Sequence, residues 1–366
     1  MVTGGSGFVG SNCLVAALRD GFQVRTTVRS MVRADEVRAM VTTGGQDGGA
    51  VEFVTADLTS DAGWPEAVAG VDYVLHVASP FPVGVPKDPD ELIVPARDGA
   101  LRVLRAAADA GVKRVVQTSS FAAIGYGHAP QARPFTEDDW TDLSGADPVA
   151  AYPTSKTLAE RAAWDFVAEH PEVELATVNP VGIFGPALGG DTGTSLEIVK
   201  RLLGGLPGVP DLSFGVVDVR DVADLHVLAM TRPKAAGERF LATSGDFMSM
   251  LEMARILRHR HRRSRPQGAN AGTAERTDSP CRSVRLGHGT TRHRTGATEE
   301  RFGQEGRKST GLDAALARGG SARLGRVPPL EVTQRSHPTR RPRSTNRPPE
   351  GNVHPSRATP AQSHEE

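Results

Sequence analysis

The chain has 366 residues, with 43 Lys and Arg against 43 Asp and Glu, so its formal net charge is zero and gives no reason to expect a nucleic-acid partner. Its apolar runs fall short of the roughly 20 residues that a membrane-spanning helix needs, and its two cysteines, Cys13 and Cys281, form no disulfide or metal-binding pattern. We therefore expect a soluble, cytoplasmic α/β protein that binds no metal, membrane or nucleic acid.

The first ten residues, MVTGGSGFVG, are typical of a strand end, a tight turn and a helix start. The glycines let the backbone approach a pyrophosphate and let the helix pack on the sheet, while the helix N-terminus offers amide donors. A glycine-rich turn alone is a weak signal. Here an amphipathic helix over 11–20 and a strand over 22–28 follow it, which is the context that dinucleotide binding requires.

The first strand is short, because only three residues precede Gly4. Strands usually run about five or six residues, and this one is expected at the centre of a doubly wound sheet. We therefore expect the true start of the coding sequence to lie upstream of Met1.

The second strand, 24–28, ends in Arg29. An acidic residue there would hold the ribose 2′-hydroxyl of NAD, whereas an Arg suits the 2′-phosphate of NADP. We therefore expect NADP, with NAD the alternative, and Arg33 is a second candidate contact. The structural alternative is that Arg29 is an ordinary solvated surface residue.

The next two strands are expected over 51–54 and 71–78. The first leads to Asp57 and Leu58, which are placed to contact an adenine. The second is almost continuously apolar, as buried parallel strands are. His76 lies within it, and we interpret it as a core or cofactor-side residue.

A helix over about 88–110 precedes a strand over 114–117, which ends in Thr118, Ser119 and Ser120. Ligands of open α/β sheets bind at the carboxyl ends of the strands, so a hydroxyl there is placed to donate to a substrate carbonyl. The segment 121–150 is rich in Gly, Pro and Asp. We expect it to be a loop that borders the substrate.

Tyr152 and Lys156 are four residues apart in the segment AYPTSKTLAE, residues 151–160. On a helix this spacing places both side chains on one face. A Lys ammonium beside a phenol lowers the pKa of the Tyr from about 10, and such a Tyr exchanges a proton near neutral pH, as carbonyl reduction requires. A chance Tyr-x-x-x-Lys is the alternative, which the glycine turn and the Ser-rich strand end argue against.

The remaining elements alternate in the same way. We expect a strand over 173–178, a helix over 194–203 that opens a smaller lobe, a helix from 218, a strand over 239–242 and an apolar helix over 248–257.

Together these motifs resemble the extended short-chain dehydrogenase/reductases, and within them the dihydroflavonol-reductase-like aldehyde and ketone reductases. The likeness spans about residues 1–257. It rests on residues 3–10, 24–29, 118–120, 152–160, Asn179-Pro180 and Gly185-Pro186.

The resemblance implies a Rossmann fold and a catalytic triad of Ser120, Tyr152 and Lys156. Ser120 would orient the carbonyl, Tyr152 would donate a proton, and Lys156 would bond the nicotinamide ribose. An Asn that many relatives carry on the helix after the fourth strand is absent from 88–110. The residues expected to contact the cofactor are Gly4, Ser6, Gly7, Phe8, Val9, Gly10, Arg29, Asp57, Leu58, Val77, Ala78, Tyr152, Lys156, Pro180, Gly182 and Ile183.

Three parts of the chain follow from this interpretation. Residues 1–178, with 216–243 returning to them, form the NADP-binding Rossmann domain. Residues 179–215 and 244–258 form a small, incomplete substrate lobe. Residues 259–366 contain no Ile, Met, Tyr or Trp and only one Phe, so they cannot bury enough apolar surface to fold, and we expect a disordered tail.

The tail has a second interpretation. Residues 311–320, in GC-rich codons read one base later, can encode the Gly-Trp-x-Pro segment with which relatives end. We therefore expect a frameshift near residues 258–265, which would leave the substrate lobe without part of its wall. A natural disordered tail and a basic nucleic-acid-binding arm are the alternatives, and the arm lacks interleaved aromatic residues.

Three functions remain open from the sequence. The first is NADPH-dependent reduction of a small aldehyde or ketone by a monomer or homodimer. The second is an NAD-dependent sugar-nucleotide epimerase or dehydratase, against which Arg29 argues. The third is a dinucleotide-binding protein without turnover.

Overall fold

The structure is a computed structural model that describes residues 1–80, 86–129, 131, 133–145, 148–190, 192–205, 208–245 and 247–264, with side chains up to residue 260. All of these residues belong to one unit, Met1–Pro328. The disordered or frameshifted tail was predicted over residues 259–366, and residues 265–366 lie outside the described part of the chain.

A seven-stranded sheet forms the centre of this unit, with the order β10-β6-β5-β4-β1-β2-β3. Every pairing in it is parallel. The order reverses between β1 and β4, so the open crevice of a doubly wound sheet is expected there. The predicted Rossmann fold is therefore confirmed. The strands are β1 (Val2–Thr3), β2 (Val24–Val28), β3 (Val51–Thr55), β4 (Tyr73–His76), β5 (Arg114–Thr118), β6 (Glu174–Pro180) and β10 (Arg239–Ala242).

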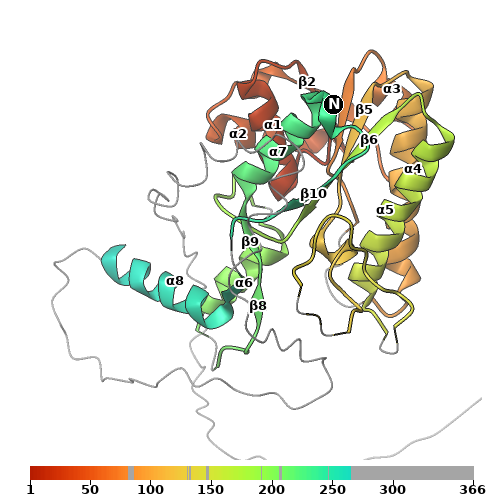
Figure 1. The fold of residues 1–366 in the computed structure, drawn as a ribbon. Helices are drawn as coiled ribbons and strands as arrows, with labels where there is room; N and C mark the ends of the chain where they lie inside the picture. The colour runs from red at the N-terminus through yellow and green to blue at the C-terminus, as the bar shows by residue number, and fades with distance from the viewer. Residues whose placement is uncertain are drawn as a thin grey trace, which may run out of the picture. The chain divides into compact units, whose positions relative to one another are not determined.

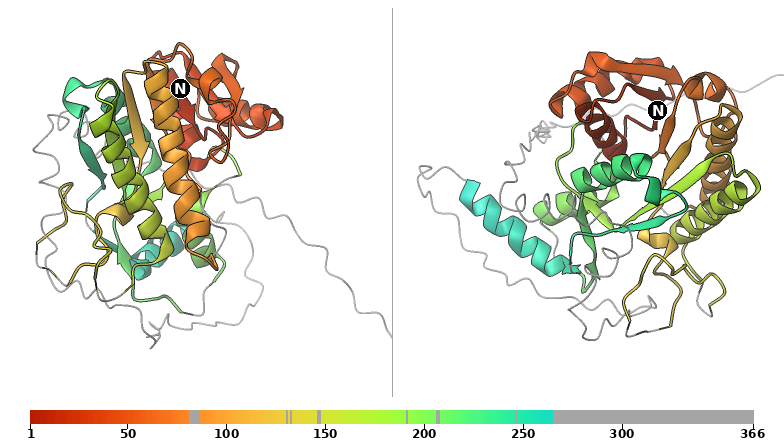
Figure 2. Two further views of the ribbon diagram at one scale, coloured as in Figure 1. Left: turned by 90° about the vertical axis from the view of Figure 1, so that its right-hand side faces the viewer. Right: turned by 45° about the horizontal axis from the view of Figure 1, so that its top comes forward.

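Helices cover both faces of the sheet (Figure 1). On one face α1 (Phe8–Arg19) packs against α7 (Val219–Thr231), and α2 (Ala34–Thr43) contributes to the same core. On the other face α4 (Asp90–Asp109) and α5 (Ala151–Glu169) lie side by side, as the left view of Figure 2 shows, with α3 (Trp64–Val68) in the same core. Each face thus has its own apolar core.

The sequence explains the long helix α4. Asp90 and Glu91 stand in its first turn, where acidic side chains favour the helix dipole. Its buried residues recur at intervals of three and four, which is one face of a helix. They are Leu92, Ile93, Ala96, Gly99, Ala100, Val103, Leu104 and Ala107.

The elements labelled β8, β9, α6 and α8 lie below the main sheet in Figure 1. There β7 (Gly182–Phe184) pairs in parallel with β9 (Val216–Asp218), and β8 (Ser213–Phe214) pairs antiparallel with β11 (Met248–Ser249). The helices α6 (Gly193–Leu203) and α8 (Met250–Ser264) contact each other. Short 3₁₀ turns are η1 (Met31–Arg33), η2 (Gly48–Ala50), η3 (Phe121–Ala123) and η4 (Pro233–Ala235).

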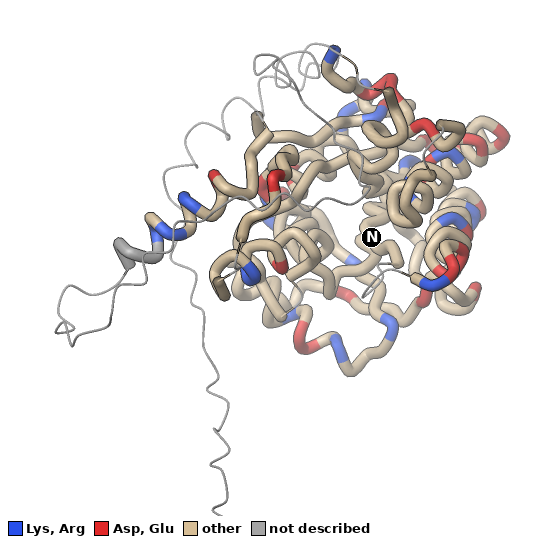
Figure 3. The backbone as a smooth tube through the Cα atoms, turned by 90° about the horizontal axis from the view of Figure 1, so that it is seen from below, with Lys and Arg blue, Asp and Glu red and all other residues tan. Residues whose placement is uncertain are grey.

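The fourth strand and the last helix differ most from the predicted boundaries. The fourth strand is four residues long rather than eight, because only Tyr73–His76 pair with the neighbouring strands. The last helix does not end at 257 but continues to Ser264, since Arg is a good helix former that needs no apolar partner. The basic residues follow one another along α8 in Figure 3. Among the described helices, none is long and apolar enough to span a membrane.

Candidate active site

The glycine turn joins β1 to α1 at the point where the strand order reverses. Gly4 has a φ of 70°, a conformation that favours glycine, and its carbonyl accepts a hydrogen bond from the Gly7 amide at 3.0 Å. A Cβ on Gly10 would lie 2.1 Å from the Gly4 carbonyl oxygen. The helix N-cap is Gly7, which brings no capping side chain. The turn therefore has the close packing and the amide donors that suit a pyrophosphate.

The end of β4 lies directly against this turn. A Cβ on Gly4 would lie 3.0 Å from the Cα of Ala78, and the Ala78 amide donates to Thr3 Oγ1 at 2.9 Å. Thr3 Oγ1 also lies 3.0 Å from His76 Nδ1. The structure thus brings the predicted cofactor residues Gly4, Val77 and Ala78 to the same edge of the sheet.

His76 is a core residue, as the sequence predicted, with 3% of its surface exposed. Burial, helped by the charge of Lys156, lowers the pKa of His76 to about 3. The imidazole is therefore neutral at physiological pH. The charge effect also indicates that Lys156, on α5, lies near the end of β4.

The predicted adenine and phosphate contacts come together at the ends of β2 and β3. Hydrogen bonds from the Thr59 amide and hydroxyl, together with the charges of Arg29 and Arg102, lower the pKa of Asp57. Arg29 is exposed, whereas Arg33 forms a bidentate pair with Glu36 at 2.9 and 3.0 Å. Of the two arginines, Arg29 is the better placed to meet a phosphate.

Other predicted contacts surround this edge. Leu58 packs on α4, because a Cβ on Gly99 would lie 3.1 Å from the Leu58 Cβ. Phe8 faces the smaller lobe, since a Cβ on Gly193 would lie 3.7 Å from its ring. Ser6 and Val9 belong to the turn and the first turn of α1. Pro180 ends β6, and Gly182 and Ile183 lie in β7, where the Gly182 amide donates to the Gly215 carbonyl at 3.0 Å.

Ser120 and Tyr152 are joined by a side-chain hydrogen bond. Ser120 follows β5 and also accepts from the Ala122 amide at 3.1 Å, which fixes the start of η3. Tyr152 stands in the first turn of α5. The hydroxyls of a strand end and a helix start therefore meet at the carboxyl edge of the sheet.

The expected acidic phenol is not found. Burial raises the pKa of Tyr152 above its ordinary value, and the hydrogen bond from Ser120 opposes this increase. The pKa of Tyr152 is raised and not lowered, so the prediction that Lys156 brings it below its ordinary value was wrong for this structure. Burial also lowers the pKa of Lys156 to about 8, against the charge of Glu160, which raises it. Desolvation outweighs pairwise attraction at both groups.

The sequence profile of the NAD dependent epimerase/dehydratase family matches residues 1–242 of the chain. The chain belongs to this family. Cinnamoyl-CoA reductase CAD2 of Medicago truncatula is 38% identical over 263 residues, which cover 70% of this chain and 79% of the relative. A putative NADPH-dependent methylglyoxal reductase, GRP2 of Candida albicans, is 33% identical over 276 residues, covering 69% and 81%.

Among solved structures, the yeast methylglyoxal/isovaleraldehyde reductase Gre2, complexed with NADPH, is similar with a TM-score of 0.60 and 29% identity. The match covers 68% of this chain and 78% of that one. These relatives place this epimerase/dehydratase chain among the extended short-chain dehydrogenase/reductases, in the dihydroflavonol-reductase-like branch, and the predicted resemblance is confirmed.

A buried polar cluster next to the site was not predicted. Its centre is Glu160, which is fully buried and lies four residues after Lys156 on α5. Only one feature of the sequence could have indicated a role for Glu160. It lies four residues after Lys156, and this spacing places both side chains on the same face of a helix. Asn179, which lies in β6, is also fully buried. Its side-chain amide donates a hydrogen bond to the Glu160 carboxylate at 2.7 Å.

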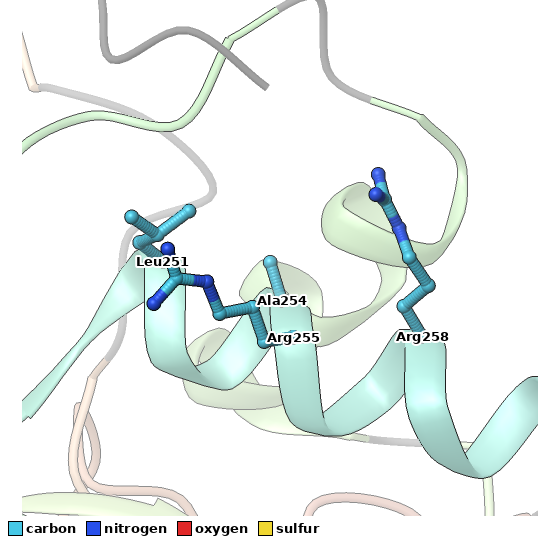
Figure 4. A pocket seen from close by; sticks show the side chains of 4 residues that line it. All are labelled: Leu251, Ala254, Arg255 and Arg258. Carbon is cyan, nitrogen blue, oxygen red and sulfur yellow. The ribbon is translucent and has the colours of Figure 1, made fainter. Parts of the chain in front are cut away.

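One hollow in the described part of the chain lies apart from the candidate active site. This hollow of about 200 Å³ on α8 is lined by Leu251, Ala254, Arg255 and Arg258 (Figure 4). It contains none of the predicted site residues, so we assign it no part in the chemistry. Within the described ranges, no group of three or more His, Cys, Asp or Glu side chains is arranged to hold a metal ion.

Proposed function

We propose that this chain reduces an aldehyde or ketone to an alcohol with NADPH. The observation that carries the proposal is the hydrogen bond between Ser120 and Tyr152, one helical turn before Lys156, at the sheet edge that also bears the glycine turn. The carbonyl-reducing relatives support it, because two of them are named or solved with NADPH.

The cofactor site is assigned residue by residue. The amides of Gly7 to Gly10 and the N-terminus of α1 would hold the pyrophosphate, and Arg29 would pair with the 2′-phosphate. Tyr152 and Lys156 would face the nicotinamide ribose. We propose that residues 1–178 and 216–243 carry these contacts, while 179–215 and 244–258 shape the substrate side.

NADPH, when bound, supplies a hydride to the carbonyl carbon. The protein's own part is to hold the carbonyl oxygen and give it a proton. Ser120 Oγ donates a hydrogen bond that orients the oxygen, and Tyr152 Oη donates the proton as negative charge develops there. The raised pKa of Tyr152 keeps the phenol protonated before the reaction. The Lys156 ammonium would donate a hydrogen bond to the nicotinamide ribose.

The first test uses the full chain with NADPH and a panel of aromatic and aliphatic aldehydes and ketones. Consumption of NADPH is followed by absorbance, and binding is measured separately by calorimetry. We expect NADPH to bind and to be consumed with at least one class of carbonyl. Binding without consumption across the panel contradicts the proposal and favours a protein without turnover. Tightly retained NAD favours the epimerase alternative.

Arg29→Ser tests the cofactor assignment. We expect the Kd for NADPH to rise about 10- to 100-fold, because hydrogen bonds to charged groups contribute about 1.5–3 kcal/mol, while the Kd for NADH changes little. Arg33→Ser is the matched control, since Arg33 is already paired with Glu36. If Arg29→Ser weakened the binding of NADPH and NADH equally, Arg29 would not be the residue that contacts the 2′-phosphate.

A further inference from the structure

The buried carboxylate of Glu160 is surrounded by donors from several parts of the fold. Oε2 accepts from the side chains of Ser119 and Asn179, and Oε1 accepts from Thr177 at 3.1 Å and from Arg239 at 2.6 Å. These donors come from the end of β5, from β6 and from β10. One carboxylate on α5 therefore joins the end of β5, the second half of β6 and the first residue of β10.

Two of these contacts adjoin the proposed catalytic residues. Ser119 directly precedes Ser120, and Asn179 Nδ2 also donates to the backbone carbonyl of Ser120 at 3.3 Å. On the other side, Glu160 lies one helical turn after Lys156 and two turns after Tyr152. The cluster thus connects the strand that carries Ser120 to the helix that carries Tyr152.

Arg239 extends the connection to the loop that follows Ser120. It donates to the carbonyls of Glu137 and Asp139, the latter at 2.8 Å, and its guanidinium lies 3.8 Å from the ring centre of Trp140. The Leu241 amide donates in turn to the Glu137 carboxylate at 3.2 Å. The ion pair between Arg239 and Glu160 therefore connects residues 137–140 to α5, the helix that carries Tyr152.

Stability alone gives a poor reason for this arrangement. Burying two charges is expensive, and apolar residues of similar volume often stabilise a fold as well or better. The chain has a contrasting ion pair at the opposite end of the same strands, between Arg114 and Glu174 at 2.6 Å. There Arg114 also donates to three carbonyls at the end of α7, which is a purely structural task.

We propose that Glu160 and Arg239 are positioning residues for the reduction, which hold Ser120 and Tyr152 in register and connect them to residues 137–140. This inference rests on the proposed function. It assigns neither residue a contact with the substrate. Their effect is on the placement of the groups that donate to the carbonyl oxygen, where an error of 1 Å can cost about 100-fold in rate.

The ion pair also sets the charge around Lys156. The titratable groups whose charges couple to Lys156 are Glu160 on its own helix and His76 from β4. His76 is neutral, so Glu160 supplies the opposing charge and raises the pKa of Lys156. Removing the charge of Glu160 therefore lowers the pKa of Lys156. The alkaline decline of activity should move to lower pH in Glu160→Gln.

The experiment compares Glu160→Gln and Arg239→Gln in the full chain, with Glu174→Gln as the control. We expect each of the first two variants to lower kcat about 10- to 100-fold while the Kd for NADPH stays within about twofold. The alkaline limb of the pH–rate profile, which starts near the Lys156 pKa of about 8 in the parent, should move to lower pH for Glu160→Gln. Glu174→Gln should leave kcat and the limb within about twofold of the parent.

Thermal unfolding of each variant checks that it folds. If Glu160→Gln does not fold, Arg239→Gln and the charge-conserving Arg239→Lys decide, and a kcat that falls in the first and recovers in the second supports the proposal. Unchanged kcat in Glu160→Gln and Arg239→Gln, or an alkaline limb that stays in place in Glu160→Gln, overturns it. Failure of the proposed function looks different, because the parent would then fail to consume NADPH or would lose no activity with Tyr152→Phe.

Discussion

Tyr152→Phe is expected to lower kcat for carbonyl reduction by about 10²- to 10⁴-fold, the range that a positioned general acid contributes. The substitution removes one oxygen and leaves the ring that packs in the first turn of α5. Ser120 keeps its bond from the Ala122 amide at 3.1 Å, so the strand end should retain its place. The loss is therefore one of chemistry, and the Kd for NADPH should change by less than about threefold.

Steady-state kinetics and NADPH binding on the same preparations separate these two effects. Tyr73→Phe is the control, because Tyr73 opens β4 at the amino end of the sheet, away from the glycine turn. We expect that variant to retain the parent's kcat. Should Tyr152→Phe keep more than about a tenth of the parent's kcat, Tyr152 is not the general acid.

Gly10→Ala is expected to weaken NADPH binding about tenfold or more, a loss of at least 1.4 kcal/mol. The added Cβ would lie 2.1 Å from the Gly4 carbonyl oxygen and 2.8 Å from its carbon. Both atoms are backbone, so the clash is relieved only if α1 and the turn move apart. The same displacement should lower the free energy of unfolding by about 1–3 kcal/mol, as overpacking does.

Calorimetric binding and denaturant unfolding measure the two effects of Gly10→Ala. The matched control is Gly190→Ala, since a Cβ on Gly190 meets no atom within 4 Å and its φ is not in the left-handed region. That variant should keep its affinity and stability. Unaltered NADPH affinity in Gly10→Ala, with the expected destabilisation, would show that the turn does not carry the pyrophosphate.

Local patterns predicted much of the fold and the position of the site. The strand at 24–28 and the helix predicted over 194–203 match β2 and α6 to within one residue, because each carries its apolar period and its end signals in a short stretch. The glycine turn and the segment 151–160 were likewise legible, since the residues of each motif are close in sequence. Parallel topology then brings them to one edge.

The properties that the sequence did not predict depend on burial and on contacts between residues far apart in the chain. The pKa of Tyr152 depends on how deeply α5 and the segment after β5 enclose it, and a spacing of four to Lys156 carries no information about that. Glu160 meets donors that stand at positions from 119 to 239, and no local pattern joins such positions. The prediction ended the last helix at 257 because apolar residues stop there. The helix continues to Ser264 because its basic residues have a high helix propensity.

The packing of α1 against α7 has a consequence for synthesis. The two helices lie at residues 8–19 and 219–231, and Arg19 reaches Asp224 across them at 2.9 Å. Domains are made from the N-terminus at about 5–20 residues per second, so the ribosome must add some two hundred residues before the partner of α1 emerges. During that interval the part of α1 that packs on α7 lacks its partner and is exposed to water, where a chaperone could cover it before α7 is made.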